Sequence, residues 1–207
     1  MTPLNDPYKA VFAGVALFAI LAAGLCFALP QDRAPSAPPV AHFTADNRLE
    51  YPSNYREWIY LSSGRGMTYG PAANPNGPPL FDNVFVDPPA YREFAQTGHW
   101  PERAVFVLEI RVAVSEGSIN RGGQFQKDIE AIEVEVKNQR FTDTDGWAYF
   151  RFDAARNPAT QLAKTATCYA CHSTNAGVEH TFVQFYPTLI DIAAAHHTLK
   201  PGNAGGR

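Results

Sequence analysis

Three segments in the second half of the chain alternate apolar and polar side chains with a period of two, which constrains the fold more than any other feature. In the first segment, one face carries Ala104, Phe106, Leu108, Ile110 and Val112. In the second, one face carries Ile132, Val134 and Val136. The third, WAYFRFD, follows the tight-turn signal Asp145-Gly146. Such alternation of β-branched and aromatic side chains is typical of strands packed on a core. We therefore expect an antiparallel β-sheet.

Helices are predicted before and after these strands. Asp87 supplies a cap, Pro88 fits a first turn and Gly98 follows the end of AYREFAQT. Ser53 predicts another short capped helix over NYREWIYL, while the Gly- and Pro-rich stretch 64–79 predicts a loop before the strand DNVFVD. The pattern turns helical again in three places, 158–166, around 168 and 188–199. The fold class is therefore α+β, an antiparallel sheet packed with helices and a helical C-terminal segment.

The composition is that of a globular chain with one core. Its 207 residues are 45% hydrophobic and 18% charged, and a chain of this length does not hold two large domains. The 17 Lys and Arg residues oppose 20 Asp and Glu residues, for a net charge of −3. Because no basic excess is available for a phosphate backbone, nucleic acid is not an expected partner.

An apolar segment near the start of the chain predicts export. Residues 10–29 contain no charge, Lys9 precedes them and Pro30 ends the segment. At ~1.5 Å per residue, a helix of this length crosses a hydrocarbon core of roughly 30 Å. The segment is either an uncleaved signal-anchor or a cleaved signal peptide, and both place the domain on the periplasmic or extracytoplasmic side. If uncleaved, it anchors the protein in the inner membrane.

The remaining boundaries follow from composition. Prolines at 30, 35, 38 and 39 favour an extended tether rather than a packed element. We therefore expect a signal or anchor over 1–29, a linker over 30–42, one domain over 43–200 and a flexible tail over 201–207.

Two cysteines and a histidine near the end form the motif Cys168-Tyr169-Ala170-Cys171-His172, the C-x-x-C-H pattern of c-type haem attachment. Two thiols three residues apart can each add to one vinyl group of a porphyrin, and the next imidazole then reaches the iron. A thioredoxin-like redox pair would need a βαβ context, and a zinc site would need further ligands near the motif. We expect one covalently attached haem c held by Cys168 and Cys171, with His172 as the iron ligand.

The sixth iron ligand decides between an electron carrier and a ligand-binding protein. No methionine follows His172 in the sequence, and Met67, in the predicted loop, is the only one besides the initiator. Other histidines stand at 42, 99, 180, 196 and 197, and a surface position is the expected place for each. A five-coordinate iron with an open distal site is therefore expected, and open sites bind small molecules.

From about Tyr51 to about Ile192 the chain resembles the cytochrome P-460 family, a group of β-rich c-haem proteins that includes the cytochromes c′-beta. The resemblance rests on five segments in the right order: PSNYREW, VFVDPPAY, AVFVLEI, RFTDTDGWAYFRF and CYACHSTNAGVEHTFVQFYPTL. It implies an antiparallel sheet packed with helices, commonly a homodimer, whose sheet side chains roof the distal face of a haem.

The resemblance also assigns two positions. In hydroxylamine-oxidising members a lysine of the central strand is joined to the haem, and that position registers here at Leu108, which cannot form the bond and would make an apolar lid. The distal carboxylate of the family registers at Glu133, a candidate catalytic base if burial raised its pKa. Three other lysines of the domain, at 127, 137 and 164, are expected to be solvated.

Three functions follow as hypotheses. The first is a haem protein that binds a small ligand such as nitric oxide and takes part in electron transfer with an unknown partner. The second is an oxidoreductase that oxidises hydroxylamine or related nitrogen oxides with Glu133 moving protons. The third is a plain electron carrier with a sixth protein ligand. Leu108 argues against the second, and the missing downstream methionine argues against the third.

Several aromatic side chains are candidates for lining the apolar cleft that a haem needs. They are Phe106, Phe125, Trp147, Tyr149 and Phe150.

Overall fold

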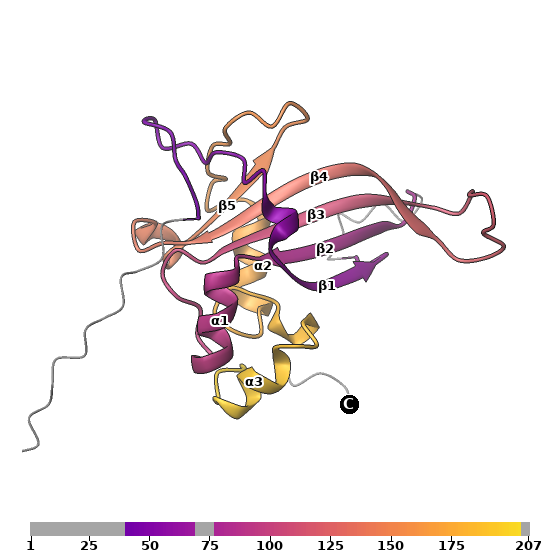
Figure 1. Ribbon diagram of the computed structural model, residues 1–207. Helices are drawn as coiled ribbons and strands as arrows, with labels where there is room; N and C mark the ends of the chain where they lie inside the picture. Colours follow the sequence, from indigo (N-terminus) through magenta and orange to yellow (C-terminus); the bar gives the residue numbers. More distant parts are fainter. Residues whose placement is uncertain (1–39, 69–76, 204–207) are drawn as a thin grey trace, which may run out of the picture. The chain divides into compact units, whose positions relative to one another are not determined.

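A five-stranded antiparallel sheet lies at the centre of the fold (Figure 1), in a computed structural model that describes residues 40–68 and 77–203. Every strand pairs with its neighbour along the chain, in the order β1-β2-β3-β4-β5. The strands are β1 Ile59–Arg65, β2 Leu80–Val86, β3 Val105–Val114, β4 Phe125–Lys137 and β5 Trp147–Phe152. The predicted antiparallel sheet is confirmed, including the three alternating segments.

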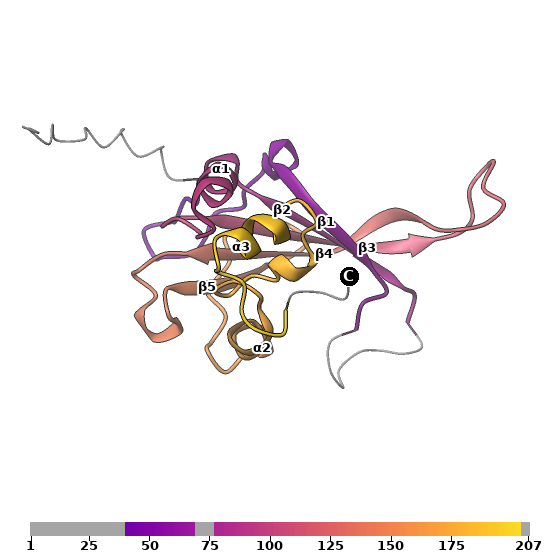
Figure 2. The ribbon, with the colours of Figure 1, turned by 90° about the horizontal axis from the view of Figure 1, so that it is seen from below.

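Three α-helices lie on one face of this sheet (Figures 1 and 2). They are α1 Pro88–Thr97, α2 Thr167–Asn175 and α3 Ile190–Ala195, with short 3-10 turns η2 Tyr55–Glu57, η3 Thr142–Thr144 and η4 Val183–Phe185. The opposite face is crossed by the segment before β1 (Figure 1). The α+β class is therefore confirmed.

The N-terminal predictions mostly fall outside the described residues. The helix at 10–29, the linker before residue 40, part of the 64–79 loop and the last residues of the tail are not described. Among the residues that are described, no helix is both long and apolar enough to cross a membrane.

The side chains of β3 point alternately into two apolar cores, one on each face of the sheet. The helix-side core contains Phe94, Trp100, Phe106, Trp147, Tyr149 and Leu189. The far-side core contains Tyr55, Val107, Ile132, Val134, Phe141 and Phe150. Because one residue step moves a side chain from one core to the other, the register of each strand is strongly specified.

The far face also buries a charge. Glu109 is 3% exposed, and it accepts hydrogen bonds from Tyr55, Arg56 and Arg111. These donors outweigh the effect of burial, which by itself would raise the pKa of Glu109, so its pKa lies below the ordinary value. The segment before β1, which carries Tyr55 and Arg56, thus covers a sheet face whose alternation alone would suggest solvent.

Helix α1 begins and ends as predicted. The Asp87 carboxylate accepts a hydrogen bond from the Ala90 amide at 2.9 Å, and Pro88 occupies the first helical position. The same carboxylate also accepts from the Val105 amide at 2.8 Å, which ties the helix start to β3. Gly98 follows the end in the left-handed region, with φ of 70°.

Three other helix predictions need correction. The capped helix after Ser53 is only the turn Tyr55–Glu57, with no side-chain cap, because the residues from Ile59 onwards enter the sheet as β1. The segment 158–166 is not helical, since Ala159 exchanges both backbone hydrogen bonds with Leu49 at 2.9 Å. The helix predicted over 188–199 is shorter, Ile190–Ala195, and His197 has a positive φ of 57°.

Candidate haem site

Helix α2 presents the C-x-x-C-H residues on the helix-bearing side of the sheet. Cys168 and Cys171 are half-buried and neither forms a disulfide. Residues three apart on a helix project from neighbouring points of its surface, so both thiols are within reach of one flat ligand. Burial is the largest cause that raises the pKa of the Cys168 thiol, and the charge of Glu133 adds to it.

His172 is held in one orientation. Its Nδ1 lies 2.7 Å from the backbone carbonyl of His180, and since a carbonyl only accepts, Nδ1 carries the hydrogen. Tyr149 and Phe182 contact the ring edge-on, at centroid distances of 4.7 and 4.6 Å. This tautomer leaves Nε2 as the basic nitrogen, the arrangement found in metal-bound histidines whose other nitrogen donates to a carbonyl. The two thiols and this imidazole therefore fit a covalently held haem.

A second acceptor lies beside the same nitrogen. Glu135 Oε1 is 3.4 Å from His172 Nδ1 and, within the described residues, this buried oxygen has no hydrogen-bond donor. Burial lowers the pKa of His172, but the charge of Glu135 and the hydrogen bond to the His180 carbonyl raise it by more. Glu135 itself is buried, 8% exposed.

The structure places Leu108 and Glu133 as a directly paired couple on β3 and β4. Arg151 of β5 pairs with Glu133 in turn and donates a hydrogen bond to its Oε1 at 2.7 Å. The Glu133 side chain is 26% exposed. The charge of Glu133 also contributes to the raised pKa of the Cys168 thiol.

Asp82 is a second carboxyl on this sheet face that sequence reasoning missed. It pairs with Ile110, which shares a face with Leu108. Burial first, and the charge of Glu133 second, raise the pKa of Asp82 from 3.8 to about 6. The signal was present in the strand DNVFVD, where Asp82 alternates in phase with the apolar positions 84 and 86.

Met67 lies on the same side as Asp82. Gly64 pairs with Asp82 across β1 and β2, and a Cβ on Gly64 would collide with the Met67 sulfur. The glycine thus makes room for the thioether to pack over the strand. Met67 is therefore the described methionine that shares a sheet face with Leu108 and Glu133.

The histidines other than His172 have different surroundings. His180 is buried, 8% exposed; its ring stacks on Trp147 at 5.7 Å and its Nδ1 is 3.2 Å from the Tyr149 hydroxyl. The expectation of a surface position was therefore wrong for His180. His99 lies near Glu179 and His196 against Gly98.

The aromatic candidates divide between the two faces. Phe106, Trp147 and Tyr149 belong to the helix-side core with the motif. Phe150 belongs to the far-side core and Phe125 is 41% exposed, so neither belongs to the core that packs against the motif.

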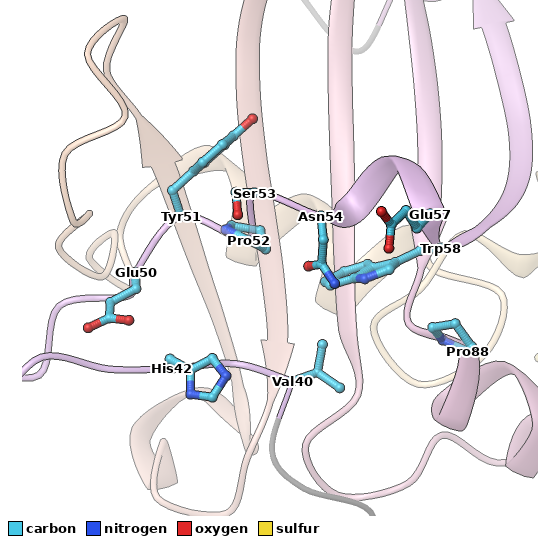
Figure 3. Close-up of a pocket in the computed structure, with 10 residues that line it drawn as sticks. All are labelled: Val40, His42, Glu50, Tyr51, Pro52, Ser53, Asn54, Glu57, Trp58 and Pro88. Atoms are coloured by element: carbon cyan, nitrogen blue, oxygen red, sulfur yellow. The ribbon is translucent and has the colours of Figure 1, made fainter.

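A pocket of about 530 Å³ lies apart from this site, against the segment before β1 (Figure 3). Its lining residues are Val40, His42, Glu50, Tyr51, Pro52, Ser53, Asn54, Glu57, Trp58 and Pro88. Val40, Tyr51 and Trp58 pack on the far-side core. The pocket therefore shares no residue with the C-x-x-C-H motif.

The sheet, the helix and its motif together define a haem-binding cytochrome. Residues 52–183 match the family profile of cytochrome P460. Because the match spans more than half of the chain, the protein belongs to the cytochrome P460 family, and the predicted family is confirmed. Membership implies a haem cofactor with its iron. No curated protein matches the chain.

Proposed function

We propose that this chain is an extracytoplasmic cytochrome with one haem c, whose iron keeps a coordination site open for a small ligand such as nitric oxide and which takes part in electron transfer. The observation that carries the proposal is the hydrogen bond from His172 Nδ1 to the His180 carbonyl at 2.7 Å. It fixes the tautomer in which Nε2 can bind iron.

The motif supplies the attachments in this proposal. Cys168 and Cys171 would bind the porphyrin through thioethers, and His172 would coordinate the iron. When bound, the haem supplies an iron centre that coordinates a ligand and exchanges electrons. The chain's own part is to hold the imidazole and to surround the ligand.

Leu108 supports the choice of ligand. It is half-buried on the sheet face that carries Ile110 and Val84. Its aliphatic side chain cannot bond covalently to a porphyrin, and an apolar surface favours a neutral diatomic ligand over a charged or strongly hydrated one. Nitric oxide and carbon monoxide meet this condition.

The absorption spectrum of the ferrous protein, matured with haem in a periplasm, tests this function when it is recorded before and after adding carbon monoxide. We expect an ordinary c-haem spectrum that shifts with the gas. A spectrum that does not change when carbon monoxide is added would contradict an open coordination site on the iron. A Met67→Leu variant then identifies the cause, since it would regain the response if Met67 were the sixth ligand.

Oxidation of hydroxylamine or related nitrogen oxides is the second candidate. It is favoured by the two carboxyl groups, Glu133 and Asp82, on the sheet face that carries Leu108. Oxidising an N–H or O–H compound removes protons together with electrons, so it needs a base beside the substrate and an external electron acceptor. The pKa of Asp82, at about 6, suits a group that accepts and releases protons near neutral pH.

Replacing Glu133 by Gln separates the two functions. Under the enzyme hypothesis, hydroxylamine turnover with an artificial electron acceptor should fall by roughly 10²-fold or more, the usual value of a general base. Carbon monoxide affinity should stay nearly unchanged. Glu130→Gln, a change at an exposed residue of the same strand, is the matched control. Unchanged turnover in Glu133→Gln combined with a loss in Asp82→Asn would transfer the role to Asp82.

The location and the oligomeric state of the domain belong to the same proposal. We infer export through residues 10–29, with anchoring in the inner membrane if that segment stays uncleaved, a linker over 30–42 and assembly as a homodimer. The apolar run without charges supports the first inference. The family resemblance supports the last.

A further inference from the structure

The turn that holds His172 has an unusual backbone. Val178 and Thr181 form an isolated bridge, with Glu179 and His180 between them. Glu179 has a φ of 51°, in the left-handed region that side chains other than glycine rarely adopt. Such a conformation persists where surrounding contacts enforce it, and it often marks a functional position. Its direct neighbour, His180, supplies the carbonyl that accepts from His172.

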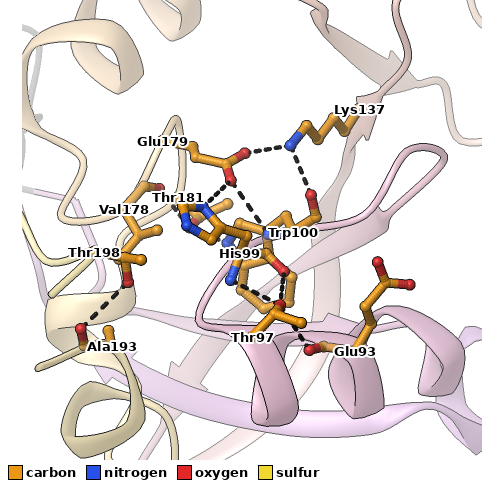
Figure 4. Close-up of polar contacts among 10 residues, drawn as sticks. All are labelled: Glu93, Thr97, His99, Trp100, Lys137, Val178, Glu179, Thr181, Ala193 and Thr198. Carbon is orange, nitrogen blue, oxygen red and sulfur yellow. Dashed lines mark hydrogen bonds and ion pairs between the residues drawn. The ribbon is translucent and has the colours of Figure 1, made fainter. Parts of the chain in front are cut away.

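The contacts that enforce this turn converge on the Glu179 carboxylate (Figure 4). Lys137 Nζ of β4 donates to Oε2 at 2.6 Å, and the Trp100 amide donates to Oε1 at 3.2 Å. Lys137 Nζ also donates to the Trp100 carbonyl at 2.6 Å. Lys137 and Glu179 thus join the turn to β4 and to the segment after α1.

Neighbouring groups fix the rest of the turn. Trp100 Nε1 donates to Thr181 Oγ1 at 2.7 Å, and Lys200 Nζ donates to the Glu179 carbonyl at 3.0 Å.

The Lys137 side chain is only 21% exposed and lies over the Trp147 ring. The expectation that Lys137 is solvated was therefore wrong.

We propose that the Lys137–Glu179 ion pair is a positioning device for the iron ligand: it holds the 178–181 turn so that the His180 carbonyl keeps its short hydrogen bond to His172. This inference rests on the proposed function, since it requires His172 to bind the iron. An acceptor close to Nδ1 makes the imidazole more electron-rich and Nε2 a stronger donor, which favours ferric iron. Lys137 and Glu179 act through the turn and touch neither the haem nor its ligand.

The choice of side chains supports this role. A glycine would fit a φ of 51° without strain, and a shorter polar residue would tolerate it better than glutamate. Glutamate is suited to this position because its carboxylate reaches both Lys137 and the Trp100 amide. The pair is mostly withdrawn from water, at 21% and 22% exposure, so salt screens it less than a surface pair.

The test uses the holoprotein with covalently bound haem. Lys137→Met removes the charge and keeps an aliphatic stem, while Lys137→Arg keeps the charge. The iron–histidine stretching band of the ferrous protein and its reduction potential are measured for both. We expect Lys137→Met to shift the band to lower frequency and to raise the potential, and Lys137→Arg to restore most of both values. Lys127→Met, at an exposed lysine of the same strand, should change neither.

The outcomes separate this inference from the function on which it rests. An unchanged band and potential in Lys137→Met would overturn the positioning role. If the wild-type protein attached haem but showed no histidine ligation, the proposed function would fail instead. Should Lys137→Met not fold, Glu179→Gln serves as the second variant, because it keeps the shape and loses the charge. Should a sixth ligand mask the band, the potential alone decides.

Discussion

Replacing Cys168 and Cys171 together by alanine is expected to remove all covalently bound haem. Both thiols are half-buried on one surface of α2 and neither is used in a disulfide, so no other described cysteine can substitute for them. The measurement is the haem-dependent peroxidase stain of the protein after denaturing electrophoresis. The double variant should give no band, and each single variant should keep one thioether and a weaker band.

Cys26 provides the matched control for this experiment. It is the remaining cysteine of the chain and stands in the predicted signal or anchor segment. Cys26→Ala should keep the full haem signal if the chain is still exported. Haem that survives denaturation in the Cys168/Cys171 double variant would refute attachment at the motif.

Trp100→Ala should cause the largest loss of stability among single changes in the described domain, about 3–5 kcal/mol in the free energy of unfolding. Trp100 is 2% exposed. Its ring stacks on Phe94 at 4.0 Å and meets Phe106 edge-on at 4.6 Å, which joins α1 to β3. Its removal opens a large cavity in the helix-side core and leaves the Thr181 hydroxyl without its donor. Urea denaturation of the holoprotein measures the effect.

Trp100→Phe separates packing from hydrogen bonding in the same assay. It keeps most of the ring contact and loses the bond from Nε1 to Thr181, so it should cost only about 1–3 kcal/mol. Equal losses in the two variants would mean that the hydrogen bond, rather than the packed ring, carries the stability. A loss below about 1 kcal/mol in Trp100→Ala would contradict the cavity argument.

The sequence was most informative where a local pattern decides the structure. Period-two alternation predicted β3, β4 and β5. Because a strand has only two sides, Leu108 lies on the face of β3 opposite to Val107, and Glu133 lies on the face of β4 opposite to Ile132. The cap at Asp87 and the glycine at 98 defined α1 in the same way, since both act within one turn.

Local sequence patterns were uninformative or misleading where distant segments decide the structure. Glu109 is buried because Tyr55 and Arg56, more than fifty residues earlier, cover its face of the sheet. The segment 158–166 is not helical, because the backbone of Ala159 pairs with that of Leu49. The acceptor of His172 was likewise invisible, since the His180 carbonyl is positioned by a strand lysine at 137. No periodicity or local propensity encodes such pairings.

The strand order has a consequence for how the protein matures. Because each strand pairs with its chain neighbour, every strand pairing joins segments that are near each other in the sequence, which favours rapid folding. None of these pairings uses the residues after β5, where α2 carries the half-exposed thiols. Haem could thus be loaded onto a chain whose sheet already exists.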